Sequence, residues 1–377
     1  MQSTGHTRFS LFGTGQTKGI SISSLARRSE LVLLPIGALL LGLLLFAVFL
    51  LIQGKSPEEF YSLVYKAGFG TAFSWQNTLV RAAPLLLAAL CVALPARLGL
   101  VVIGGEGAIV VGGVMCAVMA NLTLHATSSA GMGLSLFLMF FVGTLSGALW
   151  IGFIGALKCW RGVNETISSL LMTYIAIALM NHLVEGPLRD PNSLNKPSTT
   201  PLESWQRIGE VPGLGVHWGL VVGVICCVLI WLAVEKTNWG FGIQIAGNNM
   251  RAAQVQGLAI GRMTLVVTCL AGACAGLAGS FEVAAIHGSA NASLVAGIGY
   301  SGILVAFLAR HNPVAIIPVA ILLAGFEASS GLVQRRMDLP DATILVLQGV
   351  VFITLLTSET LYGRFKIFTP ERWKSIA

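Results

Sequence analysis

Charged residues are scarce in this chain. Only 10% of its 377 residues are Asp, Glu, Lys or Arg, whereas a soluble domain carries about 25%. Stretches that alternate with the two-residue period of a membrane-barrel strand are also missing, so the apolar segments are expected to be helices. Hydrophobic residues make up 55% of the sequence. The composition therefore predicts an all-α polytopic membrane protein.

The motifs of several enzyme classes are absent as well. Neither Gly-x-Ser-x-Gly nor His-Glu-x-x-His occurs, and the seven cysteines form no Cys-x-x-Cys pair, so we expect no catalytic centre and no metal site. Gly54-Lys55-Ser56 resembles the end of a phosphate-binding loop, but Phe49 stands where that motif needs its first glycine. The net charge of +7 is not clustered, which argues against a nucleic-acid partner.

Ten apolar runs are candidates for membrane spans. A bilayer core is about 30 Å thick and needs about 20 helical residues, and the clearest run, 31–52, contains no charge. The predicted spans are 31–52, 78–96, 98–120, 133–157, 165–184, 214–234, 263–281, 296–309, 313–331 and 341–358. The predicted domains are a tail at 1–30, a transmembrane permease domain at 31–358 and a second tail at 359–377.

Basic residues predict the orientation of these spans. When the N-terminus is placed inside, the inner segments hold about twice as many Lys and Arg residues as the outer loops, as the positive-inside rule expects. Ten spans then place both termini in the cytoplasm.

Two glycine motifs of the same form lie in the third and eighth predicted spans. Both read Ile-Gly-x-x-Gly, at 103–107 and 298–302, and the predicted topology makes them run in opposite directions. Glycine-interrupted helices in an inverted repeat are typical of a substrate path, because an unwound turn exposes backbone polar groups to a cavity. The candidate path residues are Gly104, Gly105, Glu106, Gly107, Gly299 and Gly302. The alternative is that these glycines only permit tight helix packing.

Glu106 is an ionisable group inside an apolar span, which is costly unless it meets a partner or a cavity. Arg81, in the second span, is the nearest basic candidate, so a structural ion pair between the two is an alternative to substrate contact. Glu282 and Glu327 lie near predicted outer helix ends, where they could face water.

The inner loop 238–261 is predicted to carry a short helix. Its middle, 249–256, favours helix, with Asn248 placed as the N-cap and Gly257 as the stop. A capped helix of this size on the inner surface suits docking to a soluble partner.

Several of these segments resemble one family, the bacterial ABC importer permeases for nucleosides and simple sugars. The resemblance rests on Asn77–Leu87, Arg97-Leu98-Gly99-Leu100 and Gly105-Glu106-Gly107, with Val102 replacing a usual asparagine before Ile103-Gly104. It continues through Asn164–Tyr174 and Gly186–Pro191, which are similar to the nucleoside branch, then Leu270–Gly279 and Ile303 to Asn312-Pro313. In all it covers about residues 75–355.

The resemblance implies a multi-part importer. This chain would form the path together with a second permease subunit, identical or paralogous, in the bacterial inner membrane. A cytoplasmic ATPase would bind the ATP, so the chain itself would hold no cofactor, and an extracytoplasmic lipoprotein would deliver the ligand. Asn164 and Glu165 join the candidate path, and the segment near 247–258 would dock on the ATPase. The implied docking residues are Gly247, Asn248, Arg251, Ala252, Ala253 and Gly257, with Arg251 where the general coupling motif has an acid.

A nucleoside, with purine nucleosides as candidates, is the expected ligand. Two alternatives remain open from the sequence. One is the same architecture importing a simple sugar such as ribose. The other is a self-sufficient secondary carrier that uses Glu106 and Glu282 for ion coupling.

Overall fold

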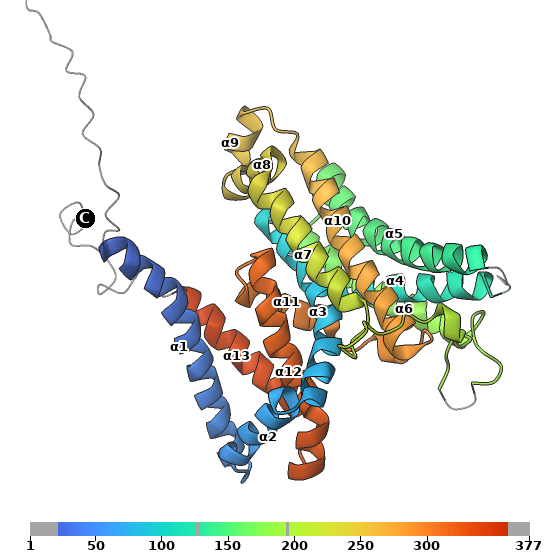
Figure 1. The fold of residues 1–377 in the computed structure, drawn as a ribbon. Coiled ribbons are helices and arrows are strands. Elements are labelled where there is room, and N and C mark those ends of the chain that lie inside the picture. Colours follow the sequence, from blue (N-terminus) through green and yellow to red (C-terminus); the bar gives the residue numbers. More distant parts are fainter. Residues whose placement is uncertain (1–21, 125–128, 194–195, 361–377) are drawn as a thin grey trace, which may run out of the picture.

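The computed structural model describes residues 22–124, 129–193 and 196–360, which form a bundle of helices (Figure 1). The α-helices are α1 (Ile22–Ile52), α2 (Pro57–Phe69), α3 (Ala72–Arg97), α4 (Gly105–Leu122), α5 (Ser129–Arg161), α6 (Glu165–Glu185), α7 (Gly219–Lys236), α8 (Asn238–Asn248), α9 (Met250–Val255), α10 (Ile260–Phe281), α11 (Ile298–Leu308), α12 (Pro313–Met337) and α13 (Ala342–Thr360). Three short helices complete the described part: η1 (Ser204–Gln206), the π-helix η2 (Glu282–His287) and η3 (Ala292–Leu294).

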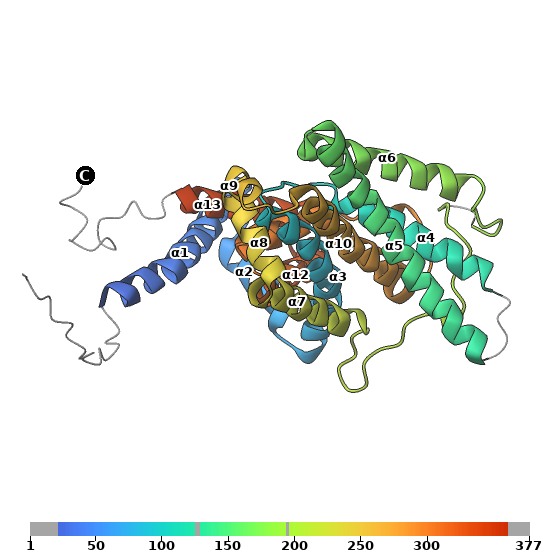
Figure 2. The same cartoon turned by 90° about the horizontal axis from the view of Figure 1, so that it is seen from above.

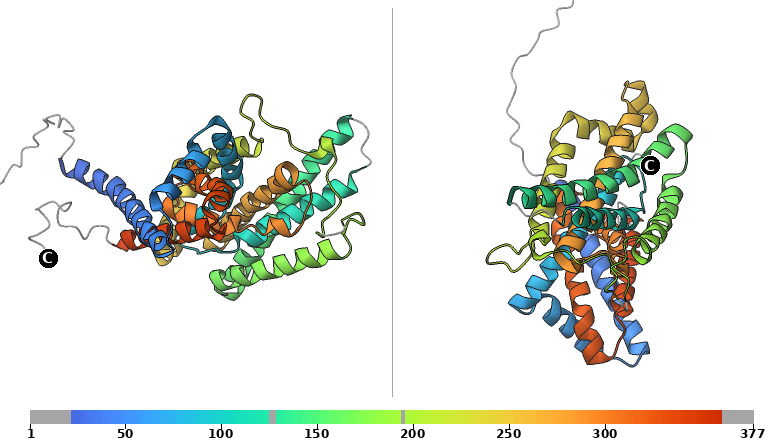
Figure 3. Two further views of the ribbon diagram at one scale, coloured as in Figure 1. Left: turned by 90° about the horizontal axis from the view of Figure 1, so that it is seen from below. Right: turned by 90° about the vertical axis from the view of Figure 1, so that its right-hand side faces the viewer.

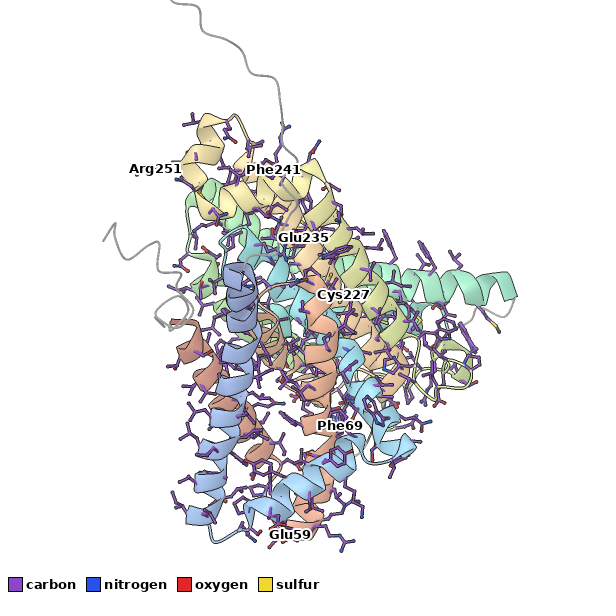
Figure 4. The ribbon with its side chains drawn as sticks, turned by 60° about the vertical axis from the view of Figure 1, so that its left-hand side comes forward. Glu59, Phe69, Cys227, Glu235, Phe241 and Arg251 are labelled. Carbon is purple, nitrogen blue, oxygen red and sulfur yellow. The ribbon has the colours of Figure 1, made fainter. Side chains whose placement is uncertain are left out.

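The long helices run between two ends of the molecule. One end carries α8 and α9, with Phe241 and Arg251, and is called the α9 end below (Figure 4). The opposite end carries α2, with Glu59, and is called the α2 end. The turns after α3, α5 and α11 lie toward the α9 end, so the order of the helices agrees with the predicted alternation of the loops.

Among the described residues, seven helices are long and apolar enough to cross a membrane by length and composition: α3, α4, α5, α6, α7, α10 continued by η2, and α12. Three shorter apolar segments, Ile36–Ile52, Ala292–Leu308 and Ala342–Ser358, match the remaining predicted spans. These helices confirm the all-α polytopic fold, while the count of ten spans stays a prediction.

Glycines let three of these helices meet backbone to backbone. A Cβ at Gly112 of α4 would lie 2.5 Å from the Gly276 Cα of α10, and one at Gly147 of α5 would lie 2.5 Å from the Gly272 carbonyl oxygen. Real side chains never approach so closely, so these positions admit only glycine without a shift of the helices. We call this contact between α4, α5 and α10 the glycine seam.

The helices are spread along one direction of the bundle. Viewed from above, α1 and α13 lie on one side, α4, α5 and α6 on the other, and α3, α10 and α12 between them (Figure 2). Helix α6 lies along the outer edge (Figure 3) and exposes Ile167, Leu171 and Ile175. A contiguous apolar surface of this kind suits lipid contact.

The structure corrects several predicted boundaries. Helix α1 begins at Ile22 instead of 31, and the span predicted from 214 begins at Gly219. The third span begins at Gly105, because residues 98–104 are not helical. Helix α2 was not predicted at all; its buried side is Phe60, Val64 and Gly68. Of the predicted tails at 1–30 and 359–377, residues 1–21 and 361–377 lie outside the described residues, while 22–30 belong to α1 and 359–360 to α13.

Candidate functional site

Glu106 joins the beginnings of two helices. It stands in the first turn of α4, fully buried, and its carboxylate accepts hydrogen bonds from the backbone N–H groups of Gly297 (2.8 Å) and Gly299 (2.5 Å) at the start of α11. Helix N-termini carry partial positive charge, so both helices stabilise a carboxylate here. In the described part of the chain no ion pair connects Glu106 with Arg81, so the predicted structural pair is wrong.

The glycine motifs lie at the starts of α4 and α11, and most of their glycines are close-packing positions. A Cβ at Gly299 would collide with the Glu106 backbone nitrogen, and one at Gly302 would lie 2.7 Å from the Ala88 Cβ of α3. At Gly104 and Gly107 it would meet the Ser169 carbonyl (2.9 Å) and the Thr173 Cα (2.8 Å) of α6. Gly105 has only an ordinary contact, 3.7 Å from the Cys91 sulfur. These geometries favour the packing interpretation of the two motifs.

Asn164 and Glu165 hold the turn between α5 and α6. The Asn164 side-chain oxygen accepts from the N–H groups of Thr166 (2.9 Å) and Ile167 (3.2 Å), so it is the N-cap of α6. Glu165 forms an ion pair with Lys158 at 2.7 Å. Both residues therefore act at a helix end, apart from the cavity described next.

A large cavity opens among α3, η2, α11, α12 and the start of α13. Its volume is about 660 Å³, within the range of small-molecule sites. A second hollow of about 550 Å³ adjoins it toward the α2 end and shares Asn77, Arg81, Ser330 and Asp341 with it. None of the eight predicted path residues lines either hollow, although Ala296 and Ile298, beside Gly297, line the first.

The sequence did not predict which polar side chains line this cavity. Glu282 is buried, lines the cavity and pairs with His287 across 3.3 Å, so it does not face bulk water as expected. Both belong to η2, and single π-helical turns occur frequently at functional sites. Glu327 also lines the cavity. The one signal in the sequence was the presence of carboxylates within apolar spans, which is by itself a pointer to function.

Several polar side chains on the cavity wall have hydrogen-bond donors or acceptors that no described residue uses. Gln348 Nε2 donates to Glu327 at 3.4 Å, and the Ser301 hydroxyl also hydrogen-bonds to this carboxylate. The side chains of Asn77, Arg81 and Asp341 make no hydrogen bond or ion pair with any described residue. The wall thus offers an amide and a guanidinium as donors and carboxylates as acceptors.

The predicted docking segment exists, with a different cap. Helix α9 begins after Asn249, whose side chain accepts from the Ala252 N–H at 3.0 Å, so the N-cap is Asn249; Asn248 ends α8 instead. Gly257 follows α9 with φ +78°, as a helix stop requires. Arg251 and Ala252 are exposed at the α9 end, and Ala253 is buried.

Helix α8 packs against the C-terminal end of α3. A Cβ at Gly247 would collide with the Arg97 carbonyl oxygen, so only glycine allows this contact. The Arg97 side chain forms an ion pair with Glu235 of α7 at 2.5 Å and donates from Nε to the His311 carbonyl at 2.8 Å. Arg97 is followed by the non-helical segment 98–104 that leads to Glu106. The segment predicted to dock therefore contacts Arg97, where the connection to the start of α4 begins.

Comparison with known proteins shows the family to which the chain belongs. The family model described as "branched-chain amino acid transport system, permease component" matches residues 74–356. The chain belongs to this family.

Individual relatives are similar over nearly the whole length. The glucose ABC transporter permease protein TsgB13 of Haloferax volcanii is 30% identical over 88% of this chain and 89% of its own length. The guanosine ABC transporter permease protein NupP of Bacillus subtilis is 27% identical over 89% and 96%. The nucleoside ABC transporter permease protein NupB of Lactococcus lactis is 26% identical over 86% and 91%.

Family membership fixes the class of activity. The chain is a permease subunit of an ABC transporter, an integral multi-pass membrane protein and a transport component rather than a catalyst. Permeases of this kind work in general with an ABC ATPase and a substrate-binding partner.

Proposed function

We propose that this chain forms the translocation path of an importer for nucleosides, with purine nucleosides as the first candidates. In this proposal a separate cytoplasmic subunit binds and hydrolyses ATP, so the chain has no cofactor of its own. A second permease subunit, identical or paralogous, completes the path. An extracytoplasmic lipoprotein delivers the ligand, and the complex sits in a bacterial inner membrane.

The observation that carries the proposal is the projecting α8–α9 segment. It presents exposed Arg251 and Ala252 at one end of the molecule, while Gly247 seats it against the backbone of Arg97. A separate motor that pressed on this segment would act on the connection to α4. We propose that Gly247, Asn248, Arg251, Ala252, Ala253 and Gly257 belong to the ATPase-docking region.

The distribution of basic residues supports the orientation. Basic side chains at the α9 end come from several separate turns: Arg97, Lys158, Arg161, Lys236, Arg251, Arg262 and Arg310. The positive-inside rule therefore favours a cytoplasmic α9 end, and with it cytoplasmic termini.

The proposed role of the glycine motifs is to shape the wall of the path. In this proposal Gly105, Glu106 and Gly299 hold the starts of α4 and α11 together, next to the cavity residues Ala296 and Ile298. Gly104 and Gly107 seat α4 against α6, and Gly302 seats α11 against α3. Asn164 and Glu165 support α6 at a distance from the cavity.

The choice of ligand rests on the printed names of the relatives. Guanosine and nucleoside permeases stand beside a glucose permease, which keeps a free sugar as the second candidate. A self-sufficient ion-coupled carrier has no support from the family.

The test is uptake by the assembled importer. Cells without their own nucleoside uptake would express the chain with its ATPase and binding protein, and uptake of labelled guanosine and uridine would be measured with and without the ATPase. We expect uptake that depends on the ATPase and is not reduced by excess ribose or glucose. Inhibition by free sugar would favour the second candidate, and uptake by the chain alone would contradict the proposal.

A Gly257→Glu variant tests the docking segment within the same assay. Gly257 has φ +78°, which L side chains rarely adopt, so this change should distort the end of α9 and lower ATP-driven uptake. Gly209→Glu is the matched control, because nothing lies near Gly209 and its backbone needs no positive φ. Equal uptake by the two variants would argue against docking through α9.

A further inference from the structure

The larger cavity has a polar wall whose donors and acceptors point to a class of ligand. Asn77 and Arg81 of α3 bring donors. Neither side chain makes a hydrogen bond or ion pair with a described residue, although the positive charge of Arg81 acts on the Glu327 carboxylate. Glu327 of α12 brings an acceptor that already receives hydrogen bonds from Gln348 and Ser301. A carboxylate has about four lone-pair positions, so Glu327 can accept from further donors.

The two adjoining hollows differ in the charged side chains that line them. Lys66 and Arg335 line the smaller, outer hollow, whereas Glu282 and Glu327 line the larger one. Eight residues separate Arg335 from Glu327, which is about 12 Å along a helix. In the larger cavity Glu282 pairs with His287, which leaves the carboxylates of Glu327 and Asp341 beside the single guanidinium of Arg81. An excess of acidic groups disfavours a phosphorylated ligand and suits hydroxyl groups, which donate to carboxylates.

Most of the remaining wall is apolar, beside the polar side chains of His287, Ser293 and Ser330. Pro84 of α3, Ile286 of η2, Ile298 of α11, and Ile344 and Leu345 of α13 contribute the apolar part. A ligand with one hydroxylated edge and one apolar face would satisfy both parts of the wall.

We propose that the larger cavity is a subsite for an uncharged, polyhydroxylated ring, in which Glu327 accepts hydrogen bonds from ring hydroxyls and Asn77 and Arg81 donate to the same ligand. The ring is carried either by a nucleoside or by a free sugar, and the chemistry of recognition is shared. This inference rests on the proposed function, since it assigns the specificity of that transport to named residues. Glu327 is its specificity-determining residue.

The experiment compares ligands that differ only in their hydroxyl groups. The complete importer, with ATPase and binding protein, is expressed with wild-type chain, Glu327→Gln or Glu210→Gln; the last removes an exposed carboxylate outside the cavity. Uptake of guanosine is compared with that of 2′,3′-dideoxyguanosine, and uptake of glucose with that of 2-deoxyglucose. Co-purification with the ATPase measures how much of each variant is assembled.

We expect the wild type to prefer the hydroxylated ligand, and Glu327→Gln to reduce that preference about tenfold, as loss of a hydrogen bond to a charged acceptor does. Because the binding protein is the same throughout, a change in the preference arises in the permease. Glu210→Gln should keep the wild-type preference.

Two results would overturn the inference. One is an unchanged preference in Glu327→Gln, and the other is an equal loss of both ligands, which indicates a structural role. Wild-type uptake itself tests the proposed function separately: guanosine uptake supports a nucleoside, glucose uptake alone moves the subsite to a free sugar, and uptake of neither ligand contradicts both proposals.

Discussion

Two glutamates at helix starts satisfy their charge in different ways, one with backbone N–H groups and one with an opposite charge. The fully buried carboxylate of Glu106 accepts hydrogen bonds from two N–H groups at the start of α11, whereas the largely buried Glu165 carboxylate pairs with the more exposed Lys158. Glu106 is the second residue of α4, and Glu165 is the first residue of α6. The same substitution at both positions therefore compares a carboxylate bound by backbone N–H groups with one bound by a lysine.

Glu106→Gln should destabilise the fold by about 1–3 kcal/mol, because the amide replaces one acceptor with a donor that faces a buried backbone N–H. Glu165→Gln should cost about 1 kcal/mol or less, since its ion pair with Lys158 is partly exposed. Thermal unfolding of the purified chain in detergent measures both. An equal loss in the two variants would show that the α4–α11 junction is not specially stabilised by the carboxylate.

His217 gives the fold a defined response to acid. It lies just before α7, accepts the Gly219 N–H at Nδ1 (3.1 Å) and donates from Nε2 to the Val80 carbonyl (3.3 Å), which requires the neutral ring. Burial lowers the pKa of this imidazole below its ordinary value. The unfolded chain therefore binds a proton more readily, and the contribution of His217 is present above about pH 6.5 and lost as the pH falls toward the folded-state pKa.

His217→Asn should reduce the acid sensitivity of the fold, because the Asn oxygen can accept the Gly219 N–H and does not titrate. The measurement is the difference in Tm between pH 7.5 and pH 5 for the wild type and the variant. If the variant loses as much stability as the wild type, another group governs the response.

At the scale of elements, close contacts decide which glycines matter. Gly247 of α8 meets the Arg97 carbonyl, whereas Gly261 at the start of α10 has open space around its Cβ position. Both belong to the same end of the molecule, so they form a matched pair.

Gly247→Ala should displace α8 from α3 and lower ATP-driven uptake several-fold, because the new methyl group collides with a backbone atom that cannot rotate away. Gly261→Ala should transport as the wild type does. Uptake per assembled complex checks both variants, and full activity of Gly247→Ala would show that the α8–α3 contact is not needed for transport.

The elements also show how far the sequence could predict this fold. Long apolar runs predicted the spanning helices because burial in lipid requires them. Helix α2 escaped prediction because Glu58, Glu59 and Lys66 on its exposed side break the apolar run in the sequence, while its buried side packs on α12. Two neighbouring asparagines, Asn248 and Asn249, can each serve as an N-cap, and only the backbone geometry selects Asn249. The cavity could not be predicted, because its wall is assembled from α3 and from elements about 200 or more residues later, between η2 and α13.

For the whole molecule, the proposed orientation can be tested by labelling. Val255 of α9 is 89% exposed at the α9 end, and Glu210 is exposed in the loop before α7. In a background with Cys159→Ser, a membrane-impermeant thiol reagent should label Val255→Cys in inside-out vesicles and Glu210→Cys in right-side-out vesicles. The reverse pattern would invert the topology.

The glycine seam limits how this molecule can change shape. Where backbones of α4, α5 and α10 touch directly, there are no side chains whose rotamers could absorb a sliding movement, so these helices are expected to travel as one block. During alternating access, α12 and α13 would then move as a second unit relative to that block. Both helices line the cavity, and the short helix α11 lies between the two moving parts.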